Sequence, residues 1–205
     1  MTFINSFEEL SKIESTEKKI KNILKYYFIK LLSKKNLNLK QGNIFYPFYH
    51  HVFNDETKNF QRQIKFLKNY GDFISYDDSI KIINEGLQNK DMYFCLSFDD
   101  GFKNIFENVT EILLSLNTPA TFFLPTSFID NSRKDSGKTF FNNNNISIEF
   151  LNWVDCREIL SEKLFTIGSH SVNHKVISSL TYEESFFEIK NSKIDIENKL
   201  SVVCN

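Results

Sequence analysis

Apolar runs and amphipathic stretches alternate along the chain from residue 43 onward. The apolar runs predict strands at IFYPFYHHVF (44–53), DFISY (72–76), MYFCLSF (92–98), ATFFLP (120–125) and LFTIG (164–168). The amphipathic stretches predict helices at NFQRQIKFLKNYG (59–71), DDSIKIINEGL (77–87), NIFENVTEILLSL (104–116), WVDCREILSEK (153–163) and TYEESFFEIKNSKIDIENKL (181–200). Strands that are apolar on both faces and alternate with helices are typical of a parallel sheet covered by helices. The pattern therefore predicts an α/β fold.

Several segments lie outside this alternation. Residues 130–149 are rich in polar side chains and predict a loop over one end of the sheet, while SVVC (201–204) is taken as a last strand. Residues 16–35 have lysines between apolar positions spaced by three and four, which predicts an amphipathic helix within an N-terminal extension, residues 1–42. Packing against the domain (residues 43–205) or against a second copy is favoured for this helix over lying on an anionic membrane surface.

Composition and charge narrow the class of protein. Hydrophobic residues make up 41% of the 205 residues, enough for one sizeable core. The formal net charge is −1, which gives no indication of nucleic-acid binding. Three widely spaced cysteines, without a CxxC pair, indicate reduced thiols, and the sequence has neither an apolar signal region nor a membrane span. We therefore expect a cytoplasmic protein, with peripheral membrane association as the alternative.

The candidate chemistry lies where two predicted strands end. Asp99 and Asp100 follow the strand MYFCLSF, and His170 and His174, four residues apart, follow the strand LFTIG. Functional groups of parallel β/α folds gather at the carboxyl ends of strands, and one helical turn would bring both imidazoles to the same side. Two imidazoles and a carboxylate are a ligand set for a divalent metal such as zinc, leaving the second carboxylate free as a base. Taken singly, the carboxylates could instead cap a helix and the histidines could lie in the surface or core.

These motifs carry a resemblance to a known family. LSFDDGF, followed some seventy residues later by IGSHSVNH, resembles the first two motifs of the NodB-type polysaccharide deacetylases, and FYHHVFND and TPATFFLPTSFI resemble flanking strands. The resemblance covers about residues 43–200. It implies a distorted (β/α) barrel and a metal-dependent enzyme that removes N-acetyl, sometimes O-acetyl, groups from an acetylated sugar polymer or sugar precursor.

Residue roles follow from the resemblance. It implies Asp99 as catalytic base and Asp100, His170 and His174 as ligands of zinc or cobalt. Gly101 would allow the tight turn and Ser171 a hydrogen bond within the ligand loop.

Two further histidines, His50 and His51, end the first predicted strand. At most one of them should face the site, because neighbouring strand residues point to opposite faces. For both histidines, packing or a hydrogen bond to one of the metal ligands is favoured over a direct role in catalysis.

The sequence departs from the family pattern after the last predicted helix. The family's later Arg- or Tyr-Pro-containing strand and its general-acid histidine have no counterpart, since no histidine follows His174. We therefore expect an incomplete, C-terminally truncated barrel, with an open edge that a second copy or a partner chain could cover. The alternatives to an active deacetylase are a non-catalytic metal-binding or interaction module, an inactive fragment, or a hydrolase of another small amide.

Overall fold

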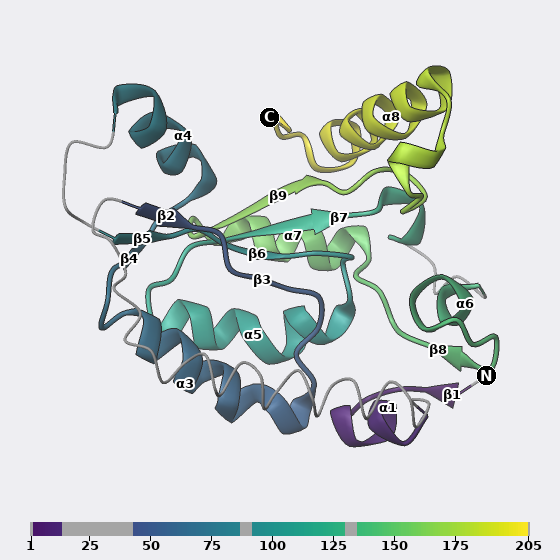
Figure 1. The fold of residues 1–205 in the computed structure, drawn as a ribbon, viewed down its shortest axis with the longest axis horizontal. Coiled ribbons are helices and arrows are strands. Elements are labelled where there is room, and N and C mark those ends of the chain that lie inside the picture. Colours follow the sequence, from purple (N-terminus) through teal and green to yellow (C-terminus); the bar gives the residue numbers. More distant parts are fainter. Residues whose placement is uncertain (1, 14–42, 87–91, 130–134, 205) are drawn as a thin grey trace.

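A computed structural model describes residues 2–13, 43–86, 92–129 and 135–204. The amphipathic helix predicted over residues 16–35 lies outside the described residues. The sheet is central and carries helices around it, as the alternation predicted (Figure 1).

Every strand pair in the described ranges is parallel. Three strands form one part of the sheet in the order β2–β5–β4 and four form the other in the order β3–β6–β7–β9. The strand bounds are β2 Asn43–Phe45, β3 Phe48–Tyr49, β4 Asp72–Phe73, β5 Met92–Phe94, β6 Leu96–Phe98, β7 Ala120–Leu124 and β9 Phe165–Ser169. Within the described residues β3 and β9 are edge strands of their sheet, so it does not close into a barrel. The predicted incomplete (β/α) barrel is confirmed.

The predicted helices are present with small shifts of their ends. Their bounds are α3 Thr57–Leu67, α4 Tyr76–Glu85, α5 Lys103–Ser115, α7 Trp153–Ser161 and α8 Tyr182–Leu200. The predicted capping box at α8 is confirmed: the Thr181 hydroxyl accepts from the Glu184 N–H (3.2 Å), and the Glu184 carboxylate accepts from the Thr181 N–H (3.0 Å). No helix among the described residues has the length and apolar character needed to cross a lipid bilayer.

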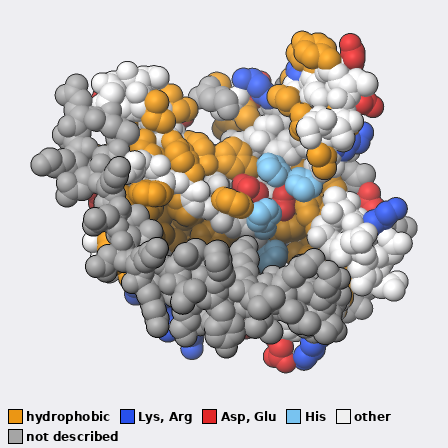
Figure 2. Space-filling view, in the orientation of Figure 1, with side chains coloured by type: hydrophobic (Ala, Val, Ile, Leu, Met, Phe, Trp, Pro, Cys, Tyr) orange, Lys and Arg blue, Asp and Glu red, His pale blue; other side chains and the backbone are white. Residues whose placement is uncertain are grey.

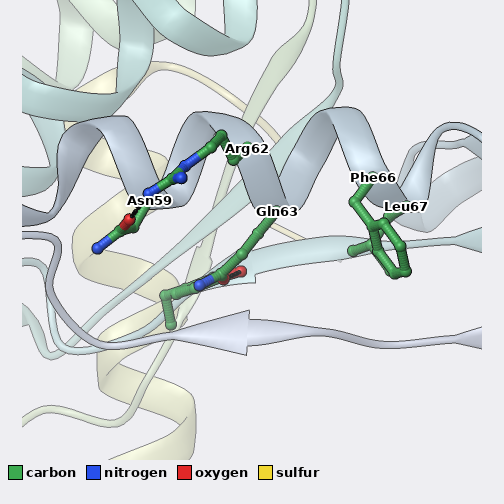
Figure 3. Close-up of a pocket in the computed structure, with 6 residues that line it drawn as sticks. Asn59, Arg62, Gln63, Phe66 and Leu67 are labelled. Atoms are coloured by element: carbon green, nitrogen blue, oxygen red, sulfur yellow. Dashed lines mark hydrogen bonds between the residues drawn. The ribbon is translucent and has the colours of Figure 1, made fainter.

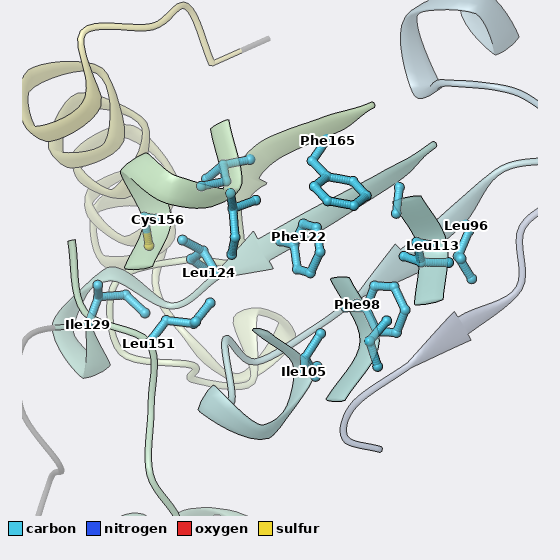
Figure 4. Close-up of a cluster of buried hydrophobic side chains, with 14 of the residues drawn as sticks. Leu96, Phe98, Ile105, Leu113, Phe122, Leu124, Ile129, Leu151, Cys156 and Phe165 are labelled. Atoms are coloured by element: carbon cyan, nitrogen blue, oxygen red, sulfur yellow. The ribbon is translucent and has the colours of Figure 1, made fainter. Parts of the chain in front are cut away.

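The main core lies between the sheet and helices α3, α5, α7 and α8. Phe98, Phe122 and Leu124 from the strands pack with Ile105 and Leu113 of α5, and all five are buried (Figure 4). Phe98 and Phe122 are stacked with their ring centroids 5.3 Å apart. All three cysteines are buried, and none of them forms a disulfide bond.

The polar segment 130–149 is not the loop that its composition predicted. Its described part forms helix α6 (Ser136–Phe141) and strand β8 (Ile146–Ser147), and β8 pairs with β1 (Thr2–Phe3). A second apolar cluster forms around these elements and helix α1 (Phe7–Ile13). Its buried members are Ile4, Leu10, Phe53, Phe102, Phe128, Ile146, Ile148 and Phe150. The segment folds because its few apolar side chains reach this cluster.

Two other local predictions were wrong. Residues 201–204 form no strand: α8 ends in a left-handed turn at Ser201 (φ 56°), whose N–H donates to the carbonyl of Glu197. The first predicted strand is divided into β2 and β3 at Tyr46 and Pro47, because proline has no N–H to donate to a strand ladder.

The close packing of α6 on β8 gives a testable expectation. A Cβ added at Gly137 would lie 1.8 Å from the carbonyl oxygen of Ile146, so Gly137→Ala forces the helix away from the strand. We expect a loss of about 1–3 kcal/mol in the free energy of unfolding, measured by urea denaturation. Lys138→Ala, at an exposed position of the same helix, is the control and should change it by less than about 0.5 kcal/mol. Equal stability of both variants would show that the segment is not packed this way.

Candidate active site

The candidate residues lie at the carboxyl ends of two strands of one sheet. Asp99 and Asp100 follow β6, and His170 follows β9, with β7 between the two strands. Backbone hydrogen bonds extend past the strand ends and align these segments: the Asp99 N–H donates to the carbonyl of Tyr49 (2.9 Å), and the His170 N–H donates to that of Leu124 (3.0 Å). Side chains that are far apart in sequence therefore meet at one end of the sheet.

Asp100, His170 and His174 converge on one point. The Nε2 atoms of His170 and His174 lie 3.3 and 3.0 Å from Oδ1 of Asp100, and one ligand atom from each residue lies within 4.8 Å of the others. Asp100 is 2% exposed, whereas about a third of each imidazole side chain is accessible. Figure 2 shows histidine side chains beside carboxylates on this face, bordered by hydrophobic side chains.

The backbone of both loops adopts left-handed conformations. Asp100 and Gly101 have φ of 70° and 66° directly after β6, and Ser171 and His174 have φ of 67° and 54° after β9. The two histidines are therefore brought together by a tight turn and not by the helical turn that their spacing predicted. Such conformations in residues other than glycine cost about 1–3 kcal/mol each and cluster at functional sites.

The surroundings of Asp100 Oδ1 show whether Asp100, His170 and His174 fit a metal ion. This oxygen is buried and accepts no hydrogen bond of good geometry, although both imidazoles lie at ion-pair distance from it. A buried carboxylate oxygen without a hydrogen bond is costly unless something else binds it. A divalent cation would satisfy it together with the two imidazole nitrogens, and a set of two nitrogens and one oxygen suits zinc. The residues present fit a metal ion.

The pKa values of the two carboxylates, Asp99 and Asp100, are shifted in opposite directions. Burial acts to raise the pKa of Asp100, but the imidazoles of His170 and His174 outweigh it and hold the pKa below its ordinary value. For Asp99, burial dominates and raises the pKa, although the imidazoles of His170, His50 and His174 oppose it. The Asp100 carboxylate in turn raises the pKa of His170 against its burial. Asp100 is therefore the more acidic of the two carboxylates, and Asp99 has the greater proton affinity.

A comparison with protein families identifies the chain. The family model described as polysaccharide deacetylase matches residues 87–202, which is more than half of the chain and includes both motifs. The chain belongs to the polysaccharide deacetylase family. It is thus related to enzymes, and the α/β architecture described above is the fold of polysaccharide deacetylases.

Several solved structures share the fold of this chain. IcaB from Ammonifex degensii has a TM-score of 0.65 at 15% identity, covering 80% of this chain and 72% of its own. The Streptococcus pyogenes deacetylase PplD, in complex with acetate, has a TM-score of 0.59 at 19% identity, covering 78% and 70%. The de-N-acetylase from Aggregatibacter actinomycetemcomitans has a TM-score of 0.57 at 21% identity, covering 78% and 76%. No curated protein matches the sequence significantly.

The two other histidines, His50 and His51, occupy different surroundings. His50 has its Nε2 3.9 Å from Oδ2 of Asp100, on the opposite carboxylate oxygen from the ligand group, and half of its side chain is exposed. His51 instead packs against the rings of Phe53 and Phe102, at centroid distances of 4.5 and 6.0 Å. One of the pair therefore faces the candidate site and the other faces the second apolar cluster, as alternation along an extended segment predicts.

Helix α8 supplies a residue that the sequence did not reveal. Glu188 is 1% exposed, and its carboxylate accepts hydrogen bonds from the turn that carries His170 and His174. Its neighbours in sequence, Phe187 and Ile189, are exposed, so the usual hydrophobic pattern of a helix gives no sign that the glutamate is buried. Only the position of α8 against β9 explains it.

A separate pocket lies along helix α3. Its volume is about 580 Å³, and it is lined by Tyr49, Asn59, Arg62, Gln63, Phe66 and Leu67 (Figure 3). The Tyr49 hydroxyl donates to Oε1 of Gln63 (2.7 Å), and the Arg62 guanidinium bonds Oδ1 of Asn59. None of the candidate ligands lines it, so it is distinct from the candidate active site.

Proposed function

We propose that the protein is a metal-dependent hydrolase that removes acetyl groups from a carbohydrate, with N-acetyl groups favoured over O-acetyl groups. The observation that carries this proposal is the convergence of His170 and His174 on a buried oxygen of Asp100, beside Asp99, in a chain of this family. Asp100, His170 and His174 would hold zinc or cobalt, which leaves a coordination position open.

Each residue of the group has a distinct part in the proposed reaction. The bound ion would polarise the acetyl carbonyl and lower the pKa of a water molecule. Asp99, not needed as a ligand, accepts the proton of the attacking water. Its buried surroundings raise its pKa, which makes the carboxylate a stronger base than an exposed aspartate. His50, whose Nε2 lies 3.9 Å from the other oxygen of Asp100, would help to hold that carboxylate.

The relatives support the proposed substrate class. The structure of PplD contains acetate, which is the acid product of hydrolysing an acetyl group, and another neighbour is a de-N-acetylase. The exposed ring of Phe48 lies next to His50 (centroids 5.6 Å apart) and offers an apolar face beside the site. We therefore favour an acetylated sugar polymer or its precursor over a small amide without a sugar.

Acetate release tests the proposal directly. Metal-free protein is incubated with N-acetylglucosamine oligomers, with and without added Zn²⁺ or Co²⁺, and acetate is quantified enzymatically. We expect release only with metal, abolished by a chelator and restored when the ion is added back. An O-acetylated sugar in parallel establishes the linkage. Absence of acetate from both substrates in a protein that binds the metal would favour the non-catalytic module instead.

A further inference from the structure

The carboxylate of Glu188 binds the turn between His170 and His174 at three points. Oε2 accepts from the backbone N–H groups of Val172 (2.9 Å) and Asn173 (2.7 Å), and Oε1 accepts from the side-chain amide of Asn173 (2.8 Å). The Lys175 ammonium lies 3.9 Å from Oε1 and offsets the negative charge of this buried group. One side chain therefore contacts the residues that lie between the two candidate ligands.

This turn needs support because its conformation is strained. Ser171 and His174 both have left-handed backbone angles, and within the turn the His174 N–H donates to Oγ of Ser171 (3.0 Å). A non-glycine residue keeps such angles only where its surroundings impose them. Hydrogen bonds to a charged acceptor are the stronger kind, and Glu188 supplies them to the two residues between the strained positions.

Both sides of the turn are fixed to rigid elements. On one side, the N–H groups of Thr126 and Ser127 donate to the carbonyls of Ser171 (3.1 Å) and Val172 (3.0 Å), just after β7. On the other side, the turn contacts α8, which is itself hydrogen-bonded to the ends of β9 and β7. The Ser192 hydroxyl of α8 is hydrogen-bonded to that of Ser169, and the Thr126 hydroxyl donates to the Asp195 carboxylate (2.7 Å). Glu188, Ser192 and Asp195 are spaced by four and three residues, so they form one polar stripe of α8.

We infer that Glu188 is the positioning residue of the candidate metal site, holding the turn in the conformation that aims His170 and His174 at Asp100. The inference rests on the proposed function for the identity of the ligands, but the bracing of the turn is independent of any metal. Groups behind metal ligands typically alter metal affinity about 10–100-fold when removed.

Three variants test this role. Glu188→Met keeps the length of the side chain and removes the acceptors, and Glu188→Gln keeps one acceptor without the charge. Glu197→Met is the matched control, because Glu197 is a glutamate of the same helix whose carboxylate accepts from the N–H of Cys204 (3.2 Å), away from the turn. Amide hydrogen exchange is followed in metal-free protein, and Co²⁺ affinity is measured by calorimetry with the visible spectrum of the bound ion.

We expect Glu188→Met to accelerate exchange at Val172 and Asn173 by at least about tenfold. It should also weaken Co²⁺ binding about 10–100-fold and change the spectrum. Glu188→Gln should lie between this variant and the wild type, and Glu197→Met should leave exchange at the turn and Co²⁺ affinity unchanged. Wild-type exchange and affinity in Glu188→Met, or a Gln variant as impaired as the Met variant, would overturn the inference. Faster exchange in a protein that binds no metal would support the bracing and contradict the proposed metal-dependent function.

Discussion

Asp100→Asn is expected to weaken Zn²⁺ or Co²⁺ binding by about 100-fold or more and to remove metal-dependent acetate release. The substitution deletes the only carboxylate of the proposed ligand set, so its effect should exceed the 10–100-fold typical of groups behind the ligands. Asparagine is the appropriate replacement because Asp100 has φ of 70°, a conformation that asparagine tolerates and alanine does not. Calorimetry on the metal-free protein measures the affinity.

A second readout does not depend on the metal. The Asp100 carboxylate raises the pKa of His170, so the neutral amide should lower that pKa in the metal-free protein, as measured by NMR titration. His50→Ala is the comparison for affinity, because His50 contacts the other oxygen of the same carboxylate and should cause a smaller loss. Equal losses in both variants, or undiminished binding in Asp100→Asn, would contradict the assigned ligand set.

Much of the fold was predictable because its signals are local. Strand β6 is buried throughout and β9 is largely buried, and both read as mostly apolar runs. Parallel strands present functional groups at their carboxyl ends, and this rule predicted that Asp99, Asp100, His170 and His174 lie close together. What the spacing of the histidines did not reveal was the conformation of their turn. Its left-handed residues, Ser171 and His174, are imposed by contacts with other elements.

The two missed features differ in whether the sequence carried a local signal for them. The polar composition of residues 130–149 concealed an alternation of apolar and polar positions at its end, where Ile146, Ile148 and Phe150 are buried. That alternation was a usable strand signal. Glu188 gave no comparable signal, because a glutamate in a helix rich in charged residues is ordinarily exposed, and its burial follows only from the docking of α8 against β9.

Asp99→Asn is expected to lower kcat for acetate release by about 10²–10⁴-fold, the range typical of a general base. The amide keeps the shape of the carboxylate and cannot accept a proton from water. Metal affinity should change little, because Asp99 is not in the converging ligand group. Measuring kcat and Co²⁺ affinity on the same preparations therefore separates loss of the base from loss of the metal.

The pH dependence of kcat is a second test of Asp99 as the catalytic base. A base must be deprotonated to act, so wild-type kcat should rise with pH through the pKa of Asp99, which burial raises and a bound cation would lower. The residual activity of Asp99→Asn should lack that rise, whereas Asp77→Asn, an exposed aspartate in the first turn of α4, should keep both the wild-type rate and the wild-type profile. If Asp99→Asn keeps both as well, the proton must pass to another group. His50 would be the next residue to replace, because its partly exposed imidazole lies at the candidate site, 3.9 Å from Oδ2 of Asp100.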